Sequence, residues 1–246
     1  MLNTIIFSFI CFFLSCIGAA TIFFIKNFNE KVASFMYSFA AGVMIASSIF
    51  SLIVPSLEYC DTFNLKDYIV LPICFFIAFL VYWFIDKLNK NNKQKINVPR
   101  LCLGIALHNI PEGMCIGFAF ASASVIGGTA AYMSAVMISL GIGFQNVPEG
   151  SSVSFPLNSL KYSKKTSFLI SALVAFVEVP AGIIAFLIGQ KYMMILPFML
   201  ALSSALMILV ACSELMPEAV EKNKKISSLS FFLGLVLMMV LDLALG

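Results

Sequence analysis

The chain has 246 residues, of which 61% are hydrophobic and only 11% are charged, and its formal net charge at pH 7 is +3. Its mean hydropathy of +1.02 excludes a soluble enzyme, and the small net charge leaves no electrostatic footprint for nucleic acid. We therefore expect an all-α integral membrane protein whose partner is the lipid bilayer and not a nucleic acid.

Eight apolar segments are each long enough to cross a membrane, because about 20 helical residues span a hydrocarbon core about 30 Å thick. They cover residues 2–25, 33–57, 68–86, 101–122, 130–157, 166–190, 192–216 and 227–245. The short polar loops between them leave no length for a soluble domain. The sequence therefore predicts a single eight-helix transmembrane transport domain over residues 1–246.

The first segment has an alternative interpretation as a cleaved signal peptide, since Gly18-Ala19-Ala20 resembles a small-residue cleavage site. A signal peptide carries basic residues before its apolar stretch, whereas the first lysine here, Lys26, follows it. A retained span is therefore favoured. The seven cysteines form no C-x-x-C pair, all but Cys60 fall within the predicted spans, and we interpret them as buried small apolar residues.

Lysine and arginine orient a membrane protein, because basic loops are retained in the cytoplasm. Thirteen of the 15 basic residues fall in the loops after the first, third, fifth and seventh spans, and only Lys66 and Lys191 fall on the opposite side. This asymmetry predicts a multi-pass protein of the plasma or inner membrane with both termini outside. The basic stretch from Lys87 to Arg100 is interpreted as a solvated cytoplasmic loop.

Four glutamates, Glu112, Glu149, Glu178 and Glu214, fall within the predicted spans. A charged side chain near the bilayer centre costs about 3 kcal/mol on insertion scales, so each one needs a partner or a function. No lysine or arginine lies deep in any predicted span. The glutamates must therefore be protonated or bind cations from outside, which indicates a cation pathway.

A motif in the fourth span is repeated in the fifth. Residues 103–113 and residues 140–150 are identical at seven of eleven positions, including the Asn, Pro, Glu and Gly of each copy. Adjacent spans joined by a short loop run antiparallel, so the copies form an inverted repeat, the arrangement with which transporters build a site near the midplane. The sequence thus predicts inverted-repeat symmetry around spans 4 and 5.

Each copy places several metal ligands on one helix face, since residues three and four apart are neighbours. Pro111 and Pro148 also free backbone carbonyls that a cavity with water or metal can satisfy. Measured in helical rise from the cytoplasmic ends, the ligands of both copies and Glu178 reach similar depths. The predicted ligands of the repeat are His108, Asn109 and Glu112 in span 4 and Gln145, Asn146 and Glu149 in span 5. Imidazole, carboxylate and amide oxygens suit Zn2+ as the transported substrate, with Fe2+, Mn2+ or Cd2+ as rivals.

The strings His-Asn-Ile-Pro-Glu-Gly at 108–113 and Gln-Asn-Val-Pro-Glu-Gly at 145–150 resemble the paired motifs of the ZIP (Zrt/Irt-like) divalent metal transporters, closest to the bacterial GufA-like branch. Eight spans with outward termini fit that family over essentially the whole chain. The resemblance implies a binuclear centre. One metal position would use His108, Glu112, Gln145, Glu149 and Met44, and the adjacent one Asn109, Asn146 and Glu178, with Glu112 and Glu149 bridging.

The sequence departs from the branch at two positions. Asn146 stands where the branch commonly has an aspartate, which removes a negative charge from the second metal position. Ser213-Glu214 stands where a His-Glu pair is common, and Glu214 is expected either to form an acidic exit or to reach the cytoplasmic surface. Met44 is equally consistent with packing. The family also implies an elevator-like motion of spans 1, 4, 5 and 6 against spans 2, 3, 7 and 8, and often a homodimer.

The hypothesis is a divalent metal uptake permease that works without ATP, since the sequence has no Walker A motif, and without catalytic or cofactor-binding residues. The alternative is a proton-coupled transporter of a small polar solute with the same glutamates as relay groups. An intramembrane metalloenzyme is the third reading. It is disfavoured because His108 is the one histidine in the chain and an H-E-x-x-H site needs two.

Overall fold

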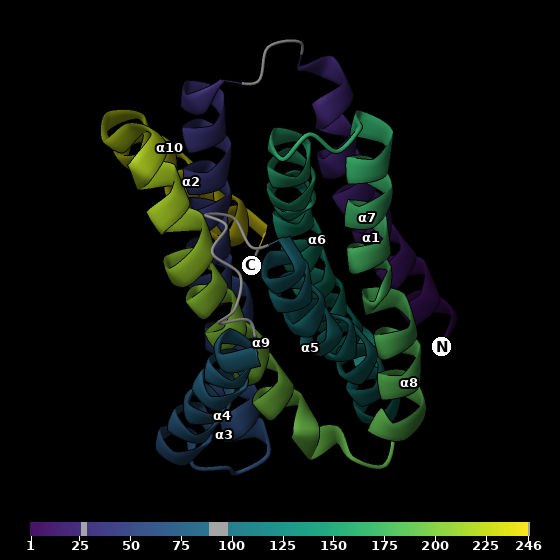
Figure 1. The fold of residues 1–246 in the computed structure, drawn as a ribbon. Helices are drawn as coiled ribbons and strands as arrows, with labels where there is room; N and C mark the ends of the chain where they lie inside the picture. Colours follow the sequence, from purple (N-terminus) through teal and green to yellow (C-terminus); the bar gives the residue numbers. More distant parts are fainter. Residues whose placement is uncertain (26–28, 89–97, 246) are drawn as a thin grey trace.

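The computed structural model describes the chain except for residues 26–28, 89–97 and 246 (Figure 1). Every regular element of the described part is a helix. The elements are α1 (Leu2–Phe24), α2 (Glu30–Ser47), a π-helical segment η1 (Ser48–Ile53), α3 (Val54–Thr62), α4 (Asp67–Leu88), α5 (Val98–Ile126), α6 (Gly128–Ser159), α7 (Lys164–Phe176), α8 (Glu178–Gly189), a 3-10 turn η2 (Met193–Ile195), α9 (Leu196–Val210), a π-helical segment η3 (Ala211–Leu215) and α10 (Met216–Leu245).

Seven stretches of the described chain are long and apolar enough to cross a membrane. The first six correspond to the first six predicted spans. The seventh, Met193–Ala244, is 52 residues long and contains both of the remaining predicted segments except for residues 192 and 245. It is interrupted at Asn223, whose φ of −161° and ψ of 98° are not helical. The chain is a multi-pass membrane protein, and its described helices occupy the regions in which spans were predicted.

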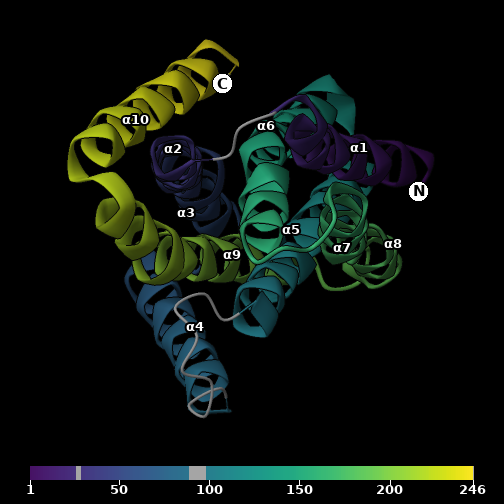
Figure 2. The same ribbon diagram turned by 45° about the horizontal axis from the view of Figure 1, so that its top comes forward.

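The helices form two bundles that stand side by side (Figure 1). We call α1, α5, α6, α7 and α8 the motif bundle, because it contains both copies of the repeated motif. We call α2, η1, α3, α4, α9, η3 and α10 the wall bundle. The two bundles meet where α9 packs against α5 and where α2 packs against α6 (Figure 2).

Glycine allows the helices of the motif bundle to approach closely. A Cβ atom at Gly113 of α5 would collide with the backbone of Glu178 in α8, and one at Gly150 of α6 would collide with the backbone of Ser15 in α1. Both glycines directly follow the motif glutamates. The two copies of the motif therefore use their glycine in the same way, to bring the backbone of a third helix against the segment that carries the glutamate.

Three irregularities were not predicted. Both α5 and α6 continue as helices through Pro111 and Pro148, but the sixth predicted span is broken at Val177. Pro180 explains this break, since it has no N–H to donate to the carbonyl of Phe176 four residues earlier. The other two are η1 and η3, where the helix widens to π-helical hydrogen bonding; such turns occur often at functional sites.

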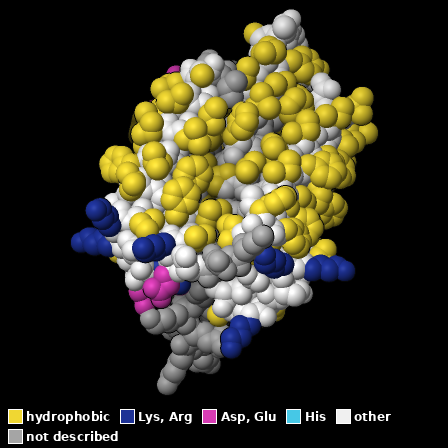
Figure 3. Space-filling view, turned by 90° about the horizontal axis from the view of Figure 1, so that it is seen from above, with side chains coloured by type: hydrophobic (Ala, Val, Ile, Leu, Met, Phe, Trp, Pro, Cys, Tyr) yellow, Lys and Arg dark blue, Asp and Glu magenta, His cyan; other side chains and the backbone are white. Residues whose placement is uncertain are grey.

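The surface is that of a protein in lipid. Figure 3 shows hydrophobic side chains over most of one face, with the lysine and arginine side chains gathered along one margin. Phe24, Leu173 and Trp83 are among the large apolar side chains that are exposed. Contiguous exposed apolar surface on this scale is expected only where a membrane or a partner covers it. Lys26, Lys90, Lys93 and Lys95 of the expected cytoplasmic loops lie outside the described residues.

The interpretation of the cysteines was correct for some and wrong for others. Cys11, Cys60, Cys74 and Cys115 are buried. Cys60 lies inside the second span instead of beyond it, because α3 extends to Thr62. Cys212, which lies in the π-helical segment η3, is exposed. Cys16 and Cys102 are half-buried.

Candidate metal centre

Three ligand side chains of the motif bundle converge in its interior. His108 and Glu112 come from α5, Glu149 comes from α6, and their ligand atoms all lie within 4.8 Å of one another. At most 2% of each residue is exposed. His108 Nε2 lies 3.3 Å from Glu149 Oε1, without the alignment of a hydrogen bond. We call these three residues the first cluster. Its members come from both copies of the repeated motif.

Gln145 connects the first cluster to the wall bundle. Its amide nitrogen donates to Glu112 Oε1 at 2.7 Å and lies 3.6 Å from the sulfur of Met207 in α9. Its amide oxygen accepts a hydrogen bond from the hydroxyl of Ser47 in α2. The amide therefore touches a carboxylate of one bundle and two side chains of the other. Neither Ser47 nor Met207 stood out in the sequence, because their positions opposite Gln145 depend on helix packing.

A second set of ligand-type side chains lies in the same bundle. Asn146 Nδ2 donates to Glu178 Oε2 at 2.8 Å and lies 3.5 Å from the backbone carbonyl oxygen of Cys11. The side chain of Asn109 donates to the carbonyl oxygen of Val174 at 3.5 Å. Asn109, Asn146 and Glu178 are at most 1% exposed. We call Asn146 and Glu178 the second cluster, and Asn109 is one helical turn from Glu112 on α5.

The two clusters and the neighbouring Asn109 contain many buried polar atoms that have no hydrogen-bond partner among the described residues. These atoms are both ring nitrogens of His108, Glu112 Oε2, Glu149 Oε2, Asn109 Oδ1, Asn146 Oδ1 and Glu178 Oε1. An unsatisfied buried polar group costs about 1–3 kcal/mol, and an unpaired buried charge costs more. No lysine or arginine is buried in the described part of the chain. The site therefore has an excess of acceptors that a cation can satisfy.

Two further predicted ligands, Met44 and Glu214, are not members of either cluster. Met44 is fully buried in α2 and belongs to the same apolar core as Ile142 and Met207. The described contacts do not join its sulfur to either cluster. Glu214 lies in η3, is half-buried, and accepts a hydrogen bond of 2.5 Å from the hydroxyl of Tyr82 in α4. The structure thus places Glu214 in a contact between two wall helices, apart from the first cluster.

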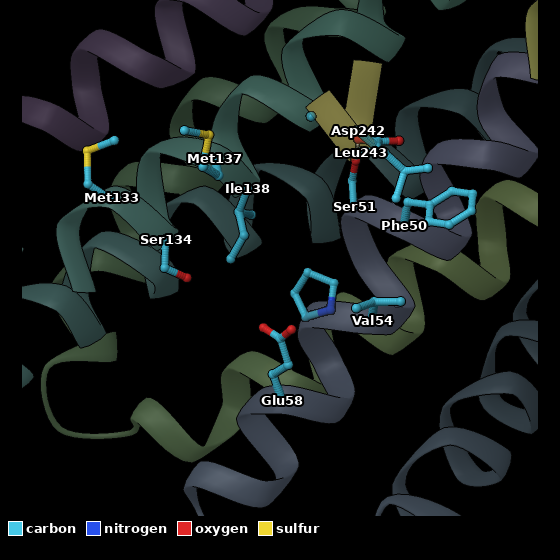
Figure 4. A pocket seen from close by; sticks show the side chains of 12 residues that line it. Phe50, Ser51, Val54, Glu58, Met133, Ser134, Met137, Ile138, Asp242 and Leu243 are labelled. Carbon is cyan, nitrogen blue, oxygen red and sulfur yellow. Dashed lines mark hydrogen bonds between the residues drawn. The ribbon is translucent and has the colours of Figure 1, made fainter. Parts of the chain in front are cut away.

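A pocket of about 510 Å³ lies between the two bundles, lined by η1, α3, the first turns of α6 and the end of α10. Figure 4 shows Ser51 and Asp242 on one side of the pocket and Met133 and Met137 of α6 on the other, with Glu58 between them. Ser51 donates a hydrogen bond of 2.5 Å to Asp242 Oδ1. Gly141, which also lines the pocket, is four residues before Gln145 on the same helix. The pocket, which the sequence did not predict, therefore ends one helical turn from a residue that touches the first cluster.

The sequence was compared with known families and proteins. The model of a family described as ZIP Zinc transporter matches residues 89–242, more than half of the chain. Zinc transporter ZIP11 of Homo sapiens is 37% identical over 147 residues, which cover 59% of this chain and 43% of that protein. The aligned chain thus spans less than half the length of the ZIP11 relative.

Two bacterial relatives align over nearly all of this chain. Zinc transporter ZIPB of Bordetella bronchiseptica is 28% identical over 247 residues, covering 94% of this chain and 78% of that protein. Zinc transporter ZupT of Chlorobaculum parvum is 28% identical over 255 residues, covering 93% of this chain and 92% of that protein. The family match includes both copies of the repeated motif and all three members of the first cluster. The chain belongs to the ZIP zinc transporter family.

Proposed function

We propose that this protein is a permease that carries divalent metal ions, zinc in the first place, across the membrane into the cytoplasm. One observation carries the proposal: His108, Glu112 and Glu149 bring buried ligand atoms within 4.8 Å of one another, and several of these atoms have no partner among the described residues. Imidazole and carboxylate are zinc ligands, and Fe2+, Mn2+ and Cd2+ bind similar sets. The names of the aligned relatives, all zinc transporters, support the choice of zinc.

The proposed topology has eight crossings in one domain, with both termini outside. The 52-residue stretch Met193–Ala244 is about twice the length that one crossing needs, and the break at Asn223 offers a turning point. Lys222, Lys224 and Lys225 flank this break, and basic residues favour the cytoplasmic side. The two motif helices would then be related by inverted symmetry, which the equivalent packing of Gly113 and Gly150 supports.

The proposed metal centre is binuclear. The first position comprises His108, Glu112, Gln145 and Glu149, with Met44 as a thioether ligand from the wall bundle. The second comprises Asn109, Asn146 and Glu178. Glu112 and Glu149 bridge the two, since each lies one helical turn from an asparagine of the second position on its own helix. We assign Glu214 to the exit, and its hydrogen bond with Tyr82 in the last turns of α4 supports this assignment, because the basic loop after α4 is expected in the cytoplasm.

The proposed access route is the pocket that contains Glu58 and Asp242. Carboxylates in a cleft with apolar walls raise the local concentration of cations. Gln145 lies one helical turn after Gly141 of the pocket, at the contact between the two bundles. Sliding of the motif bundle against the wall bundle would carry the clusters from this pocket toward the opposite side, in an elevator-like motion, and the lipid-facing apolar surface could also support a homodimer.

The first experiment measures zinc uptake into proteoliposomes that contain the purified wild type or the His108→Ala/Glu112→Ala double variant. A matched control is Glu218→Ala/Lys222→Ala, which removes a partly exposed helix pair whose Nζ and Oε1 atoms are 3.1 Å apart. We expect saturable, chelator-sensitive uptake in the wild type and in the control, and none in the double variant. Competition by iron, manganese and cadmium then ranks the ions.

Other outcomes would separate the alternatives. Metal that binds the wild type but does not enter the vesicles would indicate a sensor or a catalytic site. Transport that survives chelation, with no metal bound, would favour a proton-coupled transporter of a small polar solute, in which Glu112→Gln fails and His108→Ala is tolerated. Either result would overturn the proposed permease.

A further inference from the structure

The sulfur of Met207 lies against the proposed first metal position, although Met207 belongs to the wall bundle. Met207 is on α9, and its side chain is fully buried. The side-chain nitrogen of Gln145 donates to Met207 Sδ at 3.6 Å and to Glu112 Oε1 at 2.7 Å. A thioether of one bundle and a carboxylate of the other therefore share one donor nitrogen. The wall bundle thus places a soft ligand atom at the edge of the first cluster.

The two acceptors that share this nitrogen are also two metal ligands. A carboxylate oxygen and a thioether sulfur accept hydrogen bonds, and both coordinate transition metals. A hydrogen-bond donor and a cation are satisfied by the same kind of atom, so the amide nitrogen of Gln145 stands where positive charge is accommodated. A metal ion that takes the place of this nitrogen would meet Glu112 Oε1 and Met207 Sδ together.

Rotation of the Gln145 amide releases both of these atoms. The amide oxygen of Gln145 accepts a hydrogen bond from the hydroxyl of Ser47 in α2. A half turn of the amide exchanges its oxygen and its nitrogen, and the nitrogen can then donate to Ser47, since a hydroxyl accepts as well as donates. Gln145 Oε1 then faces the cluster as a ligand. Ser47 stays satisfied, while Glu112 Oε1 and Met207 Sδ lose their donor and can bind the ion.

Met207 and Met44 occupy equivalent places in the wall bundle. Met44 is four residues before the π-helical segment η1, and Met207 is four residues before the π-helical segment η3. Both side chains are fully buried in the same apolar core, on helices that pack against α6 and α5 respectively. Of these two sulfurs, the described contacts join that of Met207 to a ligand of the first position. This contact distinguishes Met207 from the methionine that the sequence predicted.

We propose that Met207 is a thioether ligand of the ion at the first position, and that it makes this position selective for soft and borderline ions. This inference rests on the proposed function, because it adds a ligand from the wall bundle to the proposed metal centre. The sulfur shares a lone pair with the ion, no proton is released, and no oxidation or reduction takes place. Thioethers suit zinc and softer ions such as cadmium, whereas manganese and magnesium prefer oxygen ligands.

The first test measures the Kd for Cd2+ and for Mn2+ in the wild type and in Met207→Leu. Leucine has nearly the volume of methionine, so the core should stay packed. The Kd for Cd2+ should rise at least about tenfold, since even outer-shell partners of metal ligands contribute 10- to 100-fold. The Kd for Mn2+ should change by less than about twofold. A thioether does not titrate, so the rise for Cd2+ should have the same size at every pH at which the wild type binds.

Met238→Leu is the matched control, because Met238 is a buried methionine of α10 in a different apolar core. It should leave both Kd values unchanged. An unchanged Kd for Cd2+ in Met207→Leu, or an equal rise for Cd2+ and Mn2+, would show that Met207 only packs and would overturn the inference.

X-ray absorption at the cadmium edge, with one equivalent of Cd2+, tests the bond itself. All proteins carry Cys212→Ser, because Cys212 is exposed. Met44 is also a proposed ligand, so the comparison is made in the Met44→Leu background. A cadmium–sulfur contact is expected in Met44→Leu and in Met44→Leu/Met238→Leu, and it should be absent from Met44→Leu/Met207→Leu.

Three results would contradict this expectation. Cadmium bound by Met44→Leu without sulfur, or a sulfur contact retained in Met44→Leu/Met207→Leu, would overturn the inference and leave the proposed permease standing. Cadmium bound by the protein that keeps both methionines with oxygen and nitrogen ligands alone would do the same, without requiring that a methionine variant folds. Absence of any metal binding by that protein would overturn the inference and the proposed permease together.

Discussion

The two bundles bury different kinds of polar side chain. In the described part of the chain, the buried ionisable residues other than tyrosine and cysteine are His108, Glu112, Glu149 and Glu178, and all four lie in the motif bundle. The buried polar side chains of the wall bundle are serines, and several of them bond to backbone carbonyls of neighbouring helices, as Ser34 does to Ala219 at 2.9 Å and Ser56 to Pro197 at 2.8 Å.

This difference suits the motif bundle to binding an ion and the wall bundle to supporting it. A hydroxyl that donates to a carbonyl is satisfied locally and helps two helices to pack. A buried carboxylate with an unpartnered oxygen destabilises the fold until a cation arrives. We infer that the motif bundle carries the ion while the wall bundle provides the surface against which it moves. The following predictions test this division, from the largest expected effect to the smallest.

Glu149→Gln should nearly abolish zinc uptake. The substitution keeps the shape of the side chain but removes a buried negative charge that would pair with the zinc ion, and the loss of one partner of a buried charge pair costs about 3–5 kcal/mol, a factor of at least about 100. Initial uptake rates in proteoliposomes measure this effect. Glu218→Gln, at the partly exposed surface of α10, is the control and should transport normally. Equal losses in both variants would mean that the effect is not specific to the buried site.

Gly113→Ala in the motif bundle and Gly42→Ala in the wall bundle should have different effects on zinc affinity. The added Cβ would collide with the backbone of Glu178 in the first case and with that of Phe231 in the second. Overpacking costs about 1–3 kcal/mol, so both variants should have a lower melting temperature. Only Gly113→Ala should also weaken zinc affinity, by about tenfold, because it displaces α8 and its carboxylate.

Gly104→Ala is the control for these two variants. Its Cβ would meet only Val210 Cγ2 at 3.7 Å, an ordinary contact, so stability and zinc affinity should be unchanged. If Gly42→Ala reduced zinc affinity as much as Gly113→Ala, the proposed division between the bundles would be wrong.

Acidification should weaken zinc binding. Zinc requires a neutral imidazole and ionised carboxylates, so protons compete with the metal at His108, Glu112 and Glu149. Each proton that zinc must displace raises the zinc Kd by up to about tenfold for every pH unit of acidification. Equilibrium binding measured at several pH values checks the slope. A zinc Kd that stays constant over this range would contradict a site built from these ligands.

Ser47→Ala should have a smaller effect on uptake. The hydroxyl of Ser47 donates to Gln145 across the contact between the bundles. A hydrogen bond of this kind contributes about 1 kcal/mol, so the uptake rate should change by about fivefold, while zinc affinity at equilibrium changes less. Ser56→Ala, which removes a bond within the wall bundle, is the control and should leave uptake unchanged. Identical rates for Ser47→Ala and the wild type would show that this contact does not affect transport.

Asp242→Asn should have the smallest effect. Asp242 lies in the pocket between the bundles and not in either cluster, so its charge can attract cations without binding them tightly. We expect the apparent KM for zinc to rise about threefold at low ionic strength, with kcat unchanged, and the difference to disappear at high salt. Uptake assays at two salt concentrations measure it. A fall in kcat instead would indicate that Asp242 acts at a later step.

Much of the fold could be predicted from hydropathy, because a lipid solvent leaves few alternatives to long apolar helices. The eight predicted segments coincide with helices of the structure. The irregular positions could not be predicted, since the π-helical turns at 48–53 and 211–215 depend on how their helices pack. The break at Val177 had a local signal in Pro180, but Pro111 and Pro148 carry the same signal and their helices continue.

The first cluster could be predicted because its residues lie within a repeated motif whose helical spacing is known in advance. His108 and Glu112 share a helix face, and the depth estimate brought Glu149 near them. The positions of Ser47 and Cys11 could not be inferred in this way. Each belongs to another helix, and its distance from the motif depends on contacts between backbones, such as that of Gly150 with Ser15. A single sequence contains no pattern that encodes such pairings.

The glycines after the two motif glutamates have a consequence for protein engineering. Changing the ion preference of such a site usually begins with the ligands, but a functional constellation must be held to within about 0.5 Å. At Gly113 and Gly150 that tolerance is maintained by the absence of a side chain. A library that diversifies these two positions together with the ligands would consist mostly of misaligned sites, so ligand substitutions can be evaluated fairly only while both glycines stay fixed.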